Sequence, residues 1–168
     1  TTFTVTKGLE YYQMEIVTES HEKMDLYLLR VDQSQGLDVR AATSGNVTSS
    51  EWVRQVPSEM AVHMDSPEKP LYALVNADFC ENRIPIRPRG PHHSDGKIWV
   101  SSYSIDPRLP QQALSYVGVT FDGKMVIGPS SEYQDAKKSL KECTGAGVIL
   151  LKDYVIQGGY VHDPGRDP

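Results

Sequence analysis

The sequence predicts an α+β fold with a mostly antiparallel mixed sheet and about two short helices. Two observations lead to this fold class. Short apolar runs, several with period-two alternation, recur along the chain, and this pattern is typical of strands. Helical features are confined to residues 58–64 and 132–142. The chain has 168 residues, of which 39% are hydrophobic, so we expect one domain with its own core.

Residues 1–45 are expected to form strands that pair as an antiparallel meander. Residues 9–17 are rich in aromatic and β-branched side chains, which favour strands. Met24, Leu26 and Leu28 alternate with polar neighbours, and this alternation predicts a half-buried strand.

The middle of the chain is rich in proline, which limits where regular elements can lie. Pro57 suits the first turn of a helix, so we expect a short helix over residues 58–64. The apolar run 71–75 predicts a buried central strand that ends in polar residues. Residues 83–96 are predicted to form an ordered loop, followed by a strand over residues 97–101.

The last third contains the clearest local signals. Asp122 and Gly123 lie between alternating apolar runs, which favours a tight hairpin in which both residues have positive φ. A helix with an apolar stripe is expected over residues 132–142, and Gly145 is expected to end it as a C-cap. A last hairpin is expected over residues 148–156.

Composition and charge exclude several classes of function. The 17 Lys and Arg residues against 22 Asp and Glu residues give a net charge of −5, so the chain has no overall attraction for nucleic acid or anionic lipid. No apolar run reaches the ~20 residues that span a bilayer. No basic and apolar leader begins at Thr1, so we expect no signal peptide. Cys80 and Cys143 match no zinc motif and are expected to be buried and unpaired.

Polar residues at the end of the predicted central strand are the first candidates for chemistry. Asn76, Asp78 and Glu81 would lie at the rim of a sheet, where ligands often bind. Carboxylates held there can serve as acid, base or nucleophile in glycosidic cleavage. The structural alternative is that Asn76 and Asp78 bond the backbone groups of a turn.

Positively charged residues of the proline-rich loop are the second candidates. Arg83, Arg87, Arg89, His92 and His93 form a local cationic cluster in an acidic chain. Guanidinium groups bind pairs of phosphate oxygens, and an imidazole can transfer a proton near neutral pH. This composition indicates an anion site. The alternative is that each arginine pairs with a carboxylate on the surface.

Metal binding is the third possibility. The chain offers ligand types in His92, His93, Asp95, His162 and Asp163, but their spacing matches no metal motif. We therefore expect no metal and no other cofactor.

The order of several short motifs resembles the phosphodiester glycosidase family from about residue 25 onward. In two positions the chain departs from the family, with Ala77 in place of a glycine and Cys80 in place of an aromatic residue. The matching segments are Leu29-Arg30-Val31-Asp32, the helix with Val56, Ser58, Glu59 and Met60, Asn76-Ala77-Asp78-Phe79-Cys80, residues 88–96, the hairpin 117–128, and the glycines before Leu150-Leu151-Lys152-Asp153.

The resemblance implies a hydrolase that releases a sugar from a sugar-1-phosphodiester. It implies a sugar phosphodiester or a cell-surface glycan as partner, and an extracellular or periplasmic location. In the family, a proline like Pro168 is followed by an Arg-Thr-Ala segment and later by Asp-Gly-Gly-Gly-Ser. We therefore expect the chain to be the N-terminal portion of such a domain, inactive without the C-terminal remainder of the same protein.

The resemblance and the local chemistry together give the candidate site. The catalytic candidates are Asp78, Glu81 and His92. The substrate-binding candidates are Asn76, Arg83, Arg87, His93 and Asp95. Two other functions stay open: a non-catalytic carbohydrate- or cell-wall-binding module, and a metal-assisted phosphodiesterase that uses His92 and Asp95.

Overall fold

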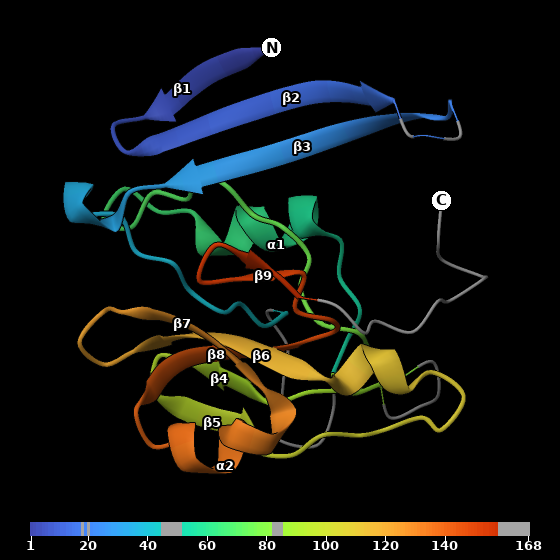
Figure 1. Ribbon diagram of the computed structural model, residues 1–168. Coiled ribbons are helices and arrows are strands. Elements are labelled where there is room, and N and C mark those ends of the chain that lie inside the picture. The colour runs from blue at the N-terminus through green and yellow to red at the C-terminus, as the bar shows by residue number, and fades with distance from the viewer. Residues whose placement is uncertain (18, 20, 45–51, 82–85, 158–168) are drawn as a thin grey trace. The chain divides into compact units, whose positions relative to one another are not determined.

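The computed structural model describes residues 1–17, 19, 21–44, 52–81 and 86–157. The fold is α+β, with antiparallel sheets of three and five strands and two short helices in the described part (Figure 1). The chain forms two compact units: Thr1–Val39 with Pro70–Ala73, and Arg40–Lys69 with Leu74–Pro168. None of the described helices has the length and apolar character needed to cross a membrane.

The first unit is an antiparallel meander, as the sequence predicts, but its strands end at Val31 and residues 37–44 form no strand. Strands β1 (Thr2–Thr6), β2 (Leu9–Val17) and β3 (Lys23–Val31) pair in that order. Gly8, with φ +86°, lies in the tight turn between β1 and β2, where a Cβ would meet the Gln35 side chain at 2.7 Å. The turn therefore requires glycine.

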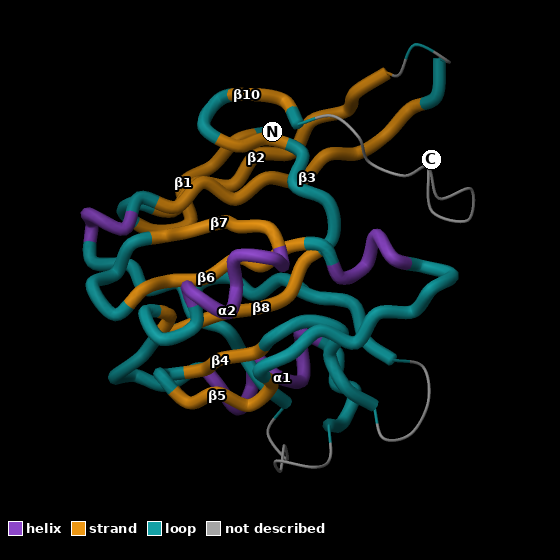
Figure 2. Tube along the Cα trace, turned by 60° about the horizontal axis from the view of Figure 1, so that its bottom comes forward, coloured by secondary structure: helices purple, strands orange, loops and turns teal. Residues whose placement is uncertain are grey.

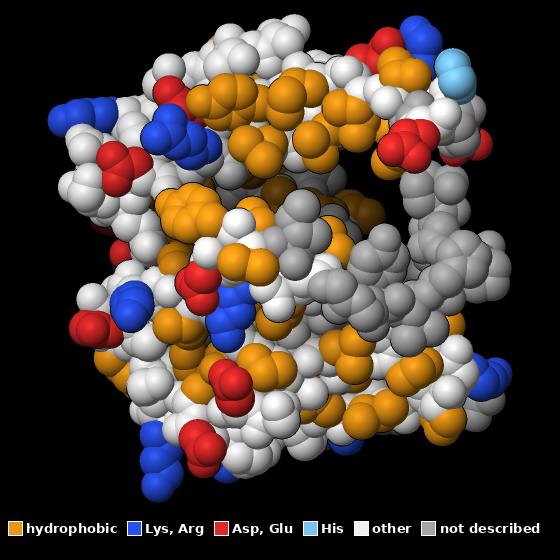
Figure 3. All heavy atoms as spheres, in the orientation of Figure 1, with side chains coloured by type: hydrophobic (Ala, Val, Ile, Leu, Met, Phe, Trp, Pro, Cys, Tyr) orange, Lys and Arg blue, Asp and Glu red, His pale blue; other side chains and the backbone are white. Residues whose placement is uncertain are grey.

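The burial predicted for β3 is wrong in part. Leu26 and Leu28 are 40% and 43% exposed, and Met14 and Ile16 on β2 are exposed to a similar extent. Met14 lies opposite Leu26, and Ile16 and Leu28 each lie two residues further along their own strand. Because alternate residues of a strand point to the same side, all four side chains share one face of the sheet. Figure 3 shows hydrophobic side chains gathered along this sheet.

The second unit contains the five-stranded sheet, in the order β5-β4-β8-β6-β7 (Figure 2). Its core is the cluster Tyr116, Tyr133, Leu140 and Cys143. Both cysteines are unpaired, as predicted, but Cys80 is exposed and only Cys143 is buried. The strands are β4 (His92–Ser94), β5 (Lys97–Val100), β6 (Ser115–Thr120), β7 (Met125–Pro129) and β8 (Leu140–Ala146).

The helix predicted over residues 132–142 is wrong for most of its length. Only α2 (Tyr133–Ala136) is α-helical in this range, and β8 begins at Leu140 as the central strand. The apolar stripe is real, because Tyr133, Leu140 and Cys143 are all core residues, yet it is divided between a helical turn and a strand. Pairing with both β4 and β6 overrides the local helical pattern.

The hairpin at Asp122 and Gly123 is confirmed, but its turn differs from the expected one. Gly123 has φ +85° whereas Asp122 does not have positive φ. The Thr120 N–H donates to the Lys124 carbonyl at 3.0 Å and the Gly123 N–H donates to the Thr120 carbonyl at 2.9 Å, so the loop 121–123 contains one left-handed glycine. A turn with two left-handed residues occurs instead between β4 and β5, where Asp95 and Gly96 have φ +51° and +78°.

The proline-rich middle of the chain confirms one prediction, contradicts another and confirms a third in part. Helix α1 (Pro57–Met64) begins at Pro57, as expected. Residues 71–77 form no strand, and Val75 is 66% exposed, because an apolar run without alternation does not by itself specify a buried strand. The loop predicted over residues 83–96 is right for residues 86–91, but residues 92–94 form strand β4; residues 83–85 lie outside the described residues.

The remaining short elements complete the described chain. The last hairpin is confirmed in shorter form as β9 (Leu151–Lys152) and β10 (Val155–Ile156). Three 3-10 helices are η1 (Gln33–Gln35), η2 (Pro110–Ala113) and η3 (Ser130–Glu132).

Truncation of the core leucine on β8 should destabilise the second unit. Leu140 is 2% exposed, so Leu140→Ala should lower the free energy of unfolding by about 2–5 kcal/mol. Leu150→Ala removes a side chain that is 65% exposed and should change it by less than about 0.5 kcal/mol. Urea denaturation followed by circular dichroism measures both, and equal effects would contradict the assignment of β8 to the core.

Candidate functional site

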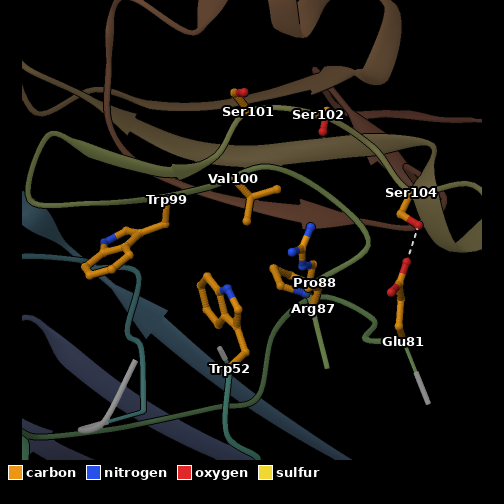
Figure 4. Close-up of a pocket in the computed structure, with 9 residues that line it drawn as sticks. All are labelled: Trp52, Glu81, Arg87, Pro88, Trp99, Val100, Ser101, Ser102 and Ser104. Atoms are coloured by element: carbon orange, nitrogen blue, oxygen red, sulfur yellow. Dashed lines mark hydrogen bonds between the residues drawn. The ribbon is translucent and has the colours of Figure 1, made fainter. Parts of the chain in front are cut away.

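The second unit contains a cavity of about 500 Å³. Figure 4 shows its lining, in which two indole rings lie at one end and a hydrogen-bonded carboxylate and hydroxyl lie at the other. The lining residues are Trp52, Glu81, Arg87, Pro88, Trp99, Val100, Ser101, Ser102 and Ser104. Two predicted site residues, Glu81 and Arg87, are therefore brought together on one cavity.

A short backbone ladder positions these two residues. The Glu81 N–H donates to the Arg87 carbonyl at 2.8 Å, and the Arg89 N–H donates to the Phe79 carbonyl at 2.7 Å. The Ser104 N–H donates to the Arg89 carbonyl at 2.7 Å, and the Ser104 hydroxyl donates to the Glu81 carboxylate. The carboxylate is therefore fixed by a neighbour that is itself bonded to the ladder.

Asp78 lies where two stretches of backbone cross. A Cβ on Gly145 would come within 2.5 Å of the Gly90 Cα and 2.8 Å of the Asp78 carboxylate, so both glycines are required by close approach. The carboxylate accepts hydrogen bonds from the N–H of Phe79 at 2.6 Å and of Gly90 at 2.9 Å. The predicted C-cap at Gly145 is wrong, since this residue lies within β8.

The electrostatics of Asp78 are set by its burial. Burial raises the pKa of this carboxyl to about 6, although the bonds from Gly90 and Phe79 and the charge of Arg89 act in the opposite direction. Asp78 also has φ +54°, a conformation that aspartate tolerates better than most residues. It does not belong to the cavity lining.

The cationic cluster separates into different roles. Arg87 is exposed at the cavity. Arg89 is 8% exposed and pairs with Asp106 at 3.5 Å, so the alternative of an arginine paired with a carboxylate holds for this residue. The pKa of Asp106 is lowered to about 2, first by its hydrogen bonds from Arg108 and further by the charge of Arg89. Arg83 lies outside the described residues.

The two histidines are both buried but have different surroundings. His93 is fully buried, with Nε2 at 2.8 Å from the Tyr133 hydroxyl and Nδ1 at 3.3 Å from the Leu140 carbonyl. Because a carbonyl only accepts, Nδ1–H donates and Nε2 accepts from Tyr133. His92 packs against the Trp52 ring, and burial followed by the influence of His93 lowers its pKa to about 4.

The remaining predicted site residues lie away from the cavity lining. Asn76 is exposed and belongs to no regular element. Asp95 is part of the β4–β5 turn and pairs with Arg40 at 3.2 Å and Lys141 at 3.6 Å. Among the described residues, no group of three or more His, Cys, Asp or Glu side chains could hold a metal ion. His162 and Asp163 lie outside the described residues.

Sequence reasoning missed the aromatic part of the site. Trp52 and Trp99 line the cavity from segments 47 positions apart in the chain. Their ring centroids are 6.4 Å apart. A usable signal was present, because these are the two tryptophans of the chain and they lie on either side of the cationic loop.

The raised pKa of Asp78 predicts how stability changes with pH. The folded protein retains this proton up to about pH 6, whereas an unfolded chain releases it near pH 4. The contribution of Asp78 to the free energy of unfolding should therefore fall as pH rises from 4 to 6, by at most about 3 kcal/mol.

Asp78→Asn should remove this fall, since an amide does not titrate. Asp153→Asn changes an exposed turn carboxylate and should keep the wild-type profile. Urea denaturation at several values between pH 4 and 7 measures the difference. Identical pH profiles for Asp78→Asn and the wild type would show that Asp78 is not a buried, protonatable group.

Comparison with known proteins adds no family assignment, because no family model matches the chain and no curated protein matches it.

Proposed function

We propose that the protein hydrolyses the bond between the anomeric carbon of a sugar and a phosphodiester oxygen. The observation that carries this proposal is the lining of the cavity, in which the carboxylate Glu81 and the guanidinium Arg87 come from two segments whose backbones are hydrogen-bonded to each other. The motif order that resembles the phosphodiester glycosidases supports the same reaction. The full reaction is proposed for a form of the protein that also carries the glycine-rich segment of that family.

Arg87 is the proposed phosphate ligand. It is exposed at the cavity, and a guanidinium offers two parallel N–H groups to phosphate oxygens. His92 does not attract the phosphate by a positive charge, because its pKa of about 4 leaves the imidazole neutral near pH 7. Arg83 remains a proposed second ligand on the strength of the sequence alone.

Glu81 is the proposed general base. It would take a proton from a water molecule whose oxygen forms a bond to the anomeric carbon. The bond from that carbon to the phosphate oxygen breaks, and its electron pair leaves with the phosphomonoester. Arg87 would neutralise the negative charge that develops there.

Among the described residues that line the cavity, Glu81 is the one carboxylate, and a single carboxylate is compatible with this leaving group. Most glycosidases need a second carboxyl group to protonate an alkoxide as it leaves. A phosphomonoester has a pKa near 6 and departs as an anion with little help from an acid. We therefore propose that Asp78 positions the ladder and does not transfer the proton.

The second candidate is a carbohydrate-binding module, and the two tryptophans of the cavity favour it. Either function involves a sugar phosphodiester or cell-surface glycan, for which we propose an extracellular or periplasmic location. Turnover separates the two functions, because a binding module holds the sugar without releasing it.

The reaction can be tested with an N-acetylglucosamine-1-phosphodiester as substrate. Glu81→Gln should lower kcat by about 100-fold or more, as expected for loss of a general base. Arg87→Ala should lower kcat/KM by a similar factor, because it acts on the charge that develops in the transition state. Release of free sugar by the full-length protein is the measurement.

Two matched controls lie on exposed parts of the second unit. Glu68→Gln and Lys138→Ala remove the same kinds of charge away from the cavity and should leave kcat within twofold. Turnover that survives Glu81→Gln would contradict the assignment of the base. Sugar binding without turnover in the full-length protein would favour the binding module.

A further inference from the structure

One end of the cavity is formed by side chains for which the proposed hydrolysis gives no role. Trp52 and Trp99 lie together at this end, whereas Glu81 and Ser104 lie at the other and Arg87 lies between them (Figure 4). Both indoles are partly buried, so each keeps part of its surface open. The cavity therefore changes from aromatic to charged and polar along its length.

A β-bulge turns Trp99 toward the cavity. His92 pairs with Val100 and His93 pairs with Ile98, so Trp99 is an extra residue in strand β5. Successive side chains of a regular strand point to opposite faces, yet Trp99 and Val100 both line the cavity. A bulge re-aims side chains in this way, and bulges are frequent beside functional sites.

Trp52 is held in place by separate contacts. Its backbone forms an isolated bridge with Ile86, the residue before Arg87 in the ladder segment. The His92 ring meets the indole edge to face, with centroids 5.1 Å apart at an interplanar angle of 85°. His92 is 6% exposed, so it is a fixed support for the indole.

The two indoles form a corner. Their planes meet at 76°, and the Lys97 ammonium lies 3.4 Å from the centre of the Trp99 ring. The face of an aromatic ring carries negative potential that attracts polarised C–H groups. A pyranose ring presents such C–H groups on its flat faces and hydroxyls around its edge, where an ammonium can donate hydrogen bonds.

We propose that the Trp52–Trp99 corner is a subsite for the pyranose ring of a neutral sugar. This inference rests on the proposed function, since it places the sugar at the aromatic end and the phosphate at Arg87. The subsite selects a ring with an exposed apolar face, and it binds that ring without any contribution from the phosphate.

The chain contains two tryptophans, so a ¹⁵N-labelled sample gives two indole N–H signals that report on the corner directly. The full chain is titrated separately with methyl α-N-acetylglucosaminide, inorganic phosphate and uridine. The neutral sugar should shift both indole signals. Trp99→Ala should weaken its binding roughly threefold to tenfold, and Trp99→Phe should retain most of it.

Matched variants separate this subsite from the anion site. Arg87→Ala should bind the neutral sugar within twofold of the wild type and lose the response to phosphate. Phe121→Ala removes an exposed aromatic ring from the β6–β7 hairpin and should leave sugar binding unchanged. Thermal unfolding of each variant confirms that it is folded.

Several outcomes would overturn the subsite. The first is a neutral sugar that leaves both indole signals in place, and the second is a Trp99→Ala variant that binds the sugar within twofold. A response of the indoles to uridine alone would identify the corner as a site for a planar ring. Failure of the proposed hydrolysis has a different signature, because the sugar would then shift the indole signals while the full-length protein releases no product.

Discussion

The close approach of Gly90 and Gly145 is the constraint on which the cavity depends. A Cβ on either glycine would come within 2.5 Å of the other residue's Cα, and the Asp78 carboxylate bonds the Gly90 N–H at the same point. Gly90 follows the ladder that carries Glu81 and Arg87, while Gly145 belongs to β8. The crossing therefore fixes the charged wall of the cavity to the central strand.

The aromatic wall depends on the same strand. β8 pairs with β4, and β4 pairs with β5, the strand whose bulge turns Trp99 toward the cavity. Glu142 of β8 is 3% exposed and accepts hydrogen bonds from the N–H of Asp95 and of Ala41, each at 3.0 Å. Leaving this buried carboxylate without hydrogen-bond donors would destabilise the fold. The bond from Asp95 therefore holds the β4–β5 turn against β8.

The sequence predicts individual helices and hairpins better than it predicts which strands pair with one another. The meander, helix α1 and the two later hairpins follow from alternation, Pro57 and turn residues. β8 could not be predicted, because the apolar stripe that ends at Cys143 also suits a helix. Only the pairing of this segment with β4 and β6 makes it a strand. Glu81 and Arg87 were found from their charges. Trp99 was missed, since the bulge that directs it depends on register.

The distribution of charge in the second unit gives Arg87 its proposed specificity. Arg89 is neutralised by Asp106, and the two buried histidines have lowered pKa values that leave them neutral at pH 7. Arg87 therefore supplies positive charge at the middle of the cavity while the rings beside it stay uncharged. A ligand in which an anion is joined to a neutral ring matches this arrangement, with the anion at Arg87 and the ring at the indoles. The Lys97 ammonium, 3.4 Å from the centre of the Trp99 ring, adds a hydrogen-bond donor at the aromatic end for the hydroxyls of a bound sugar.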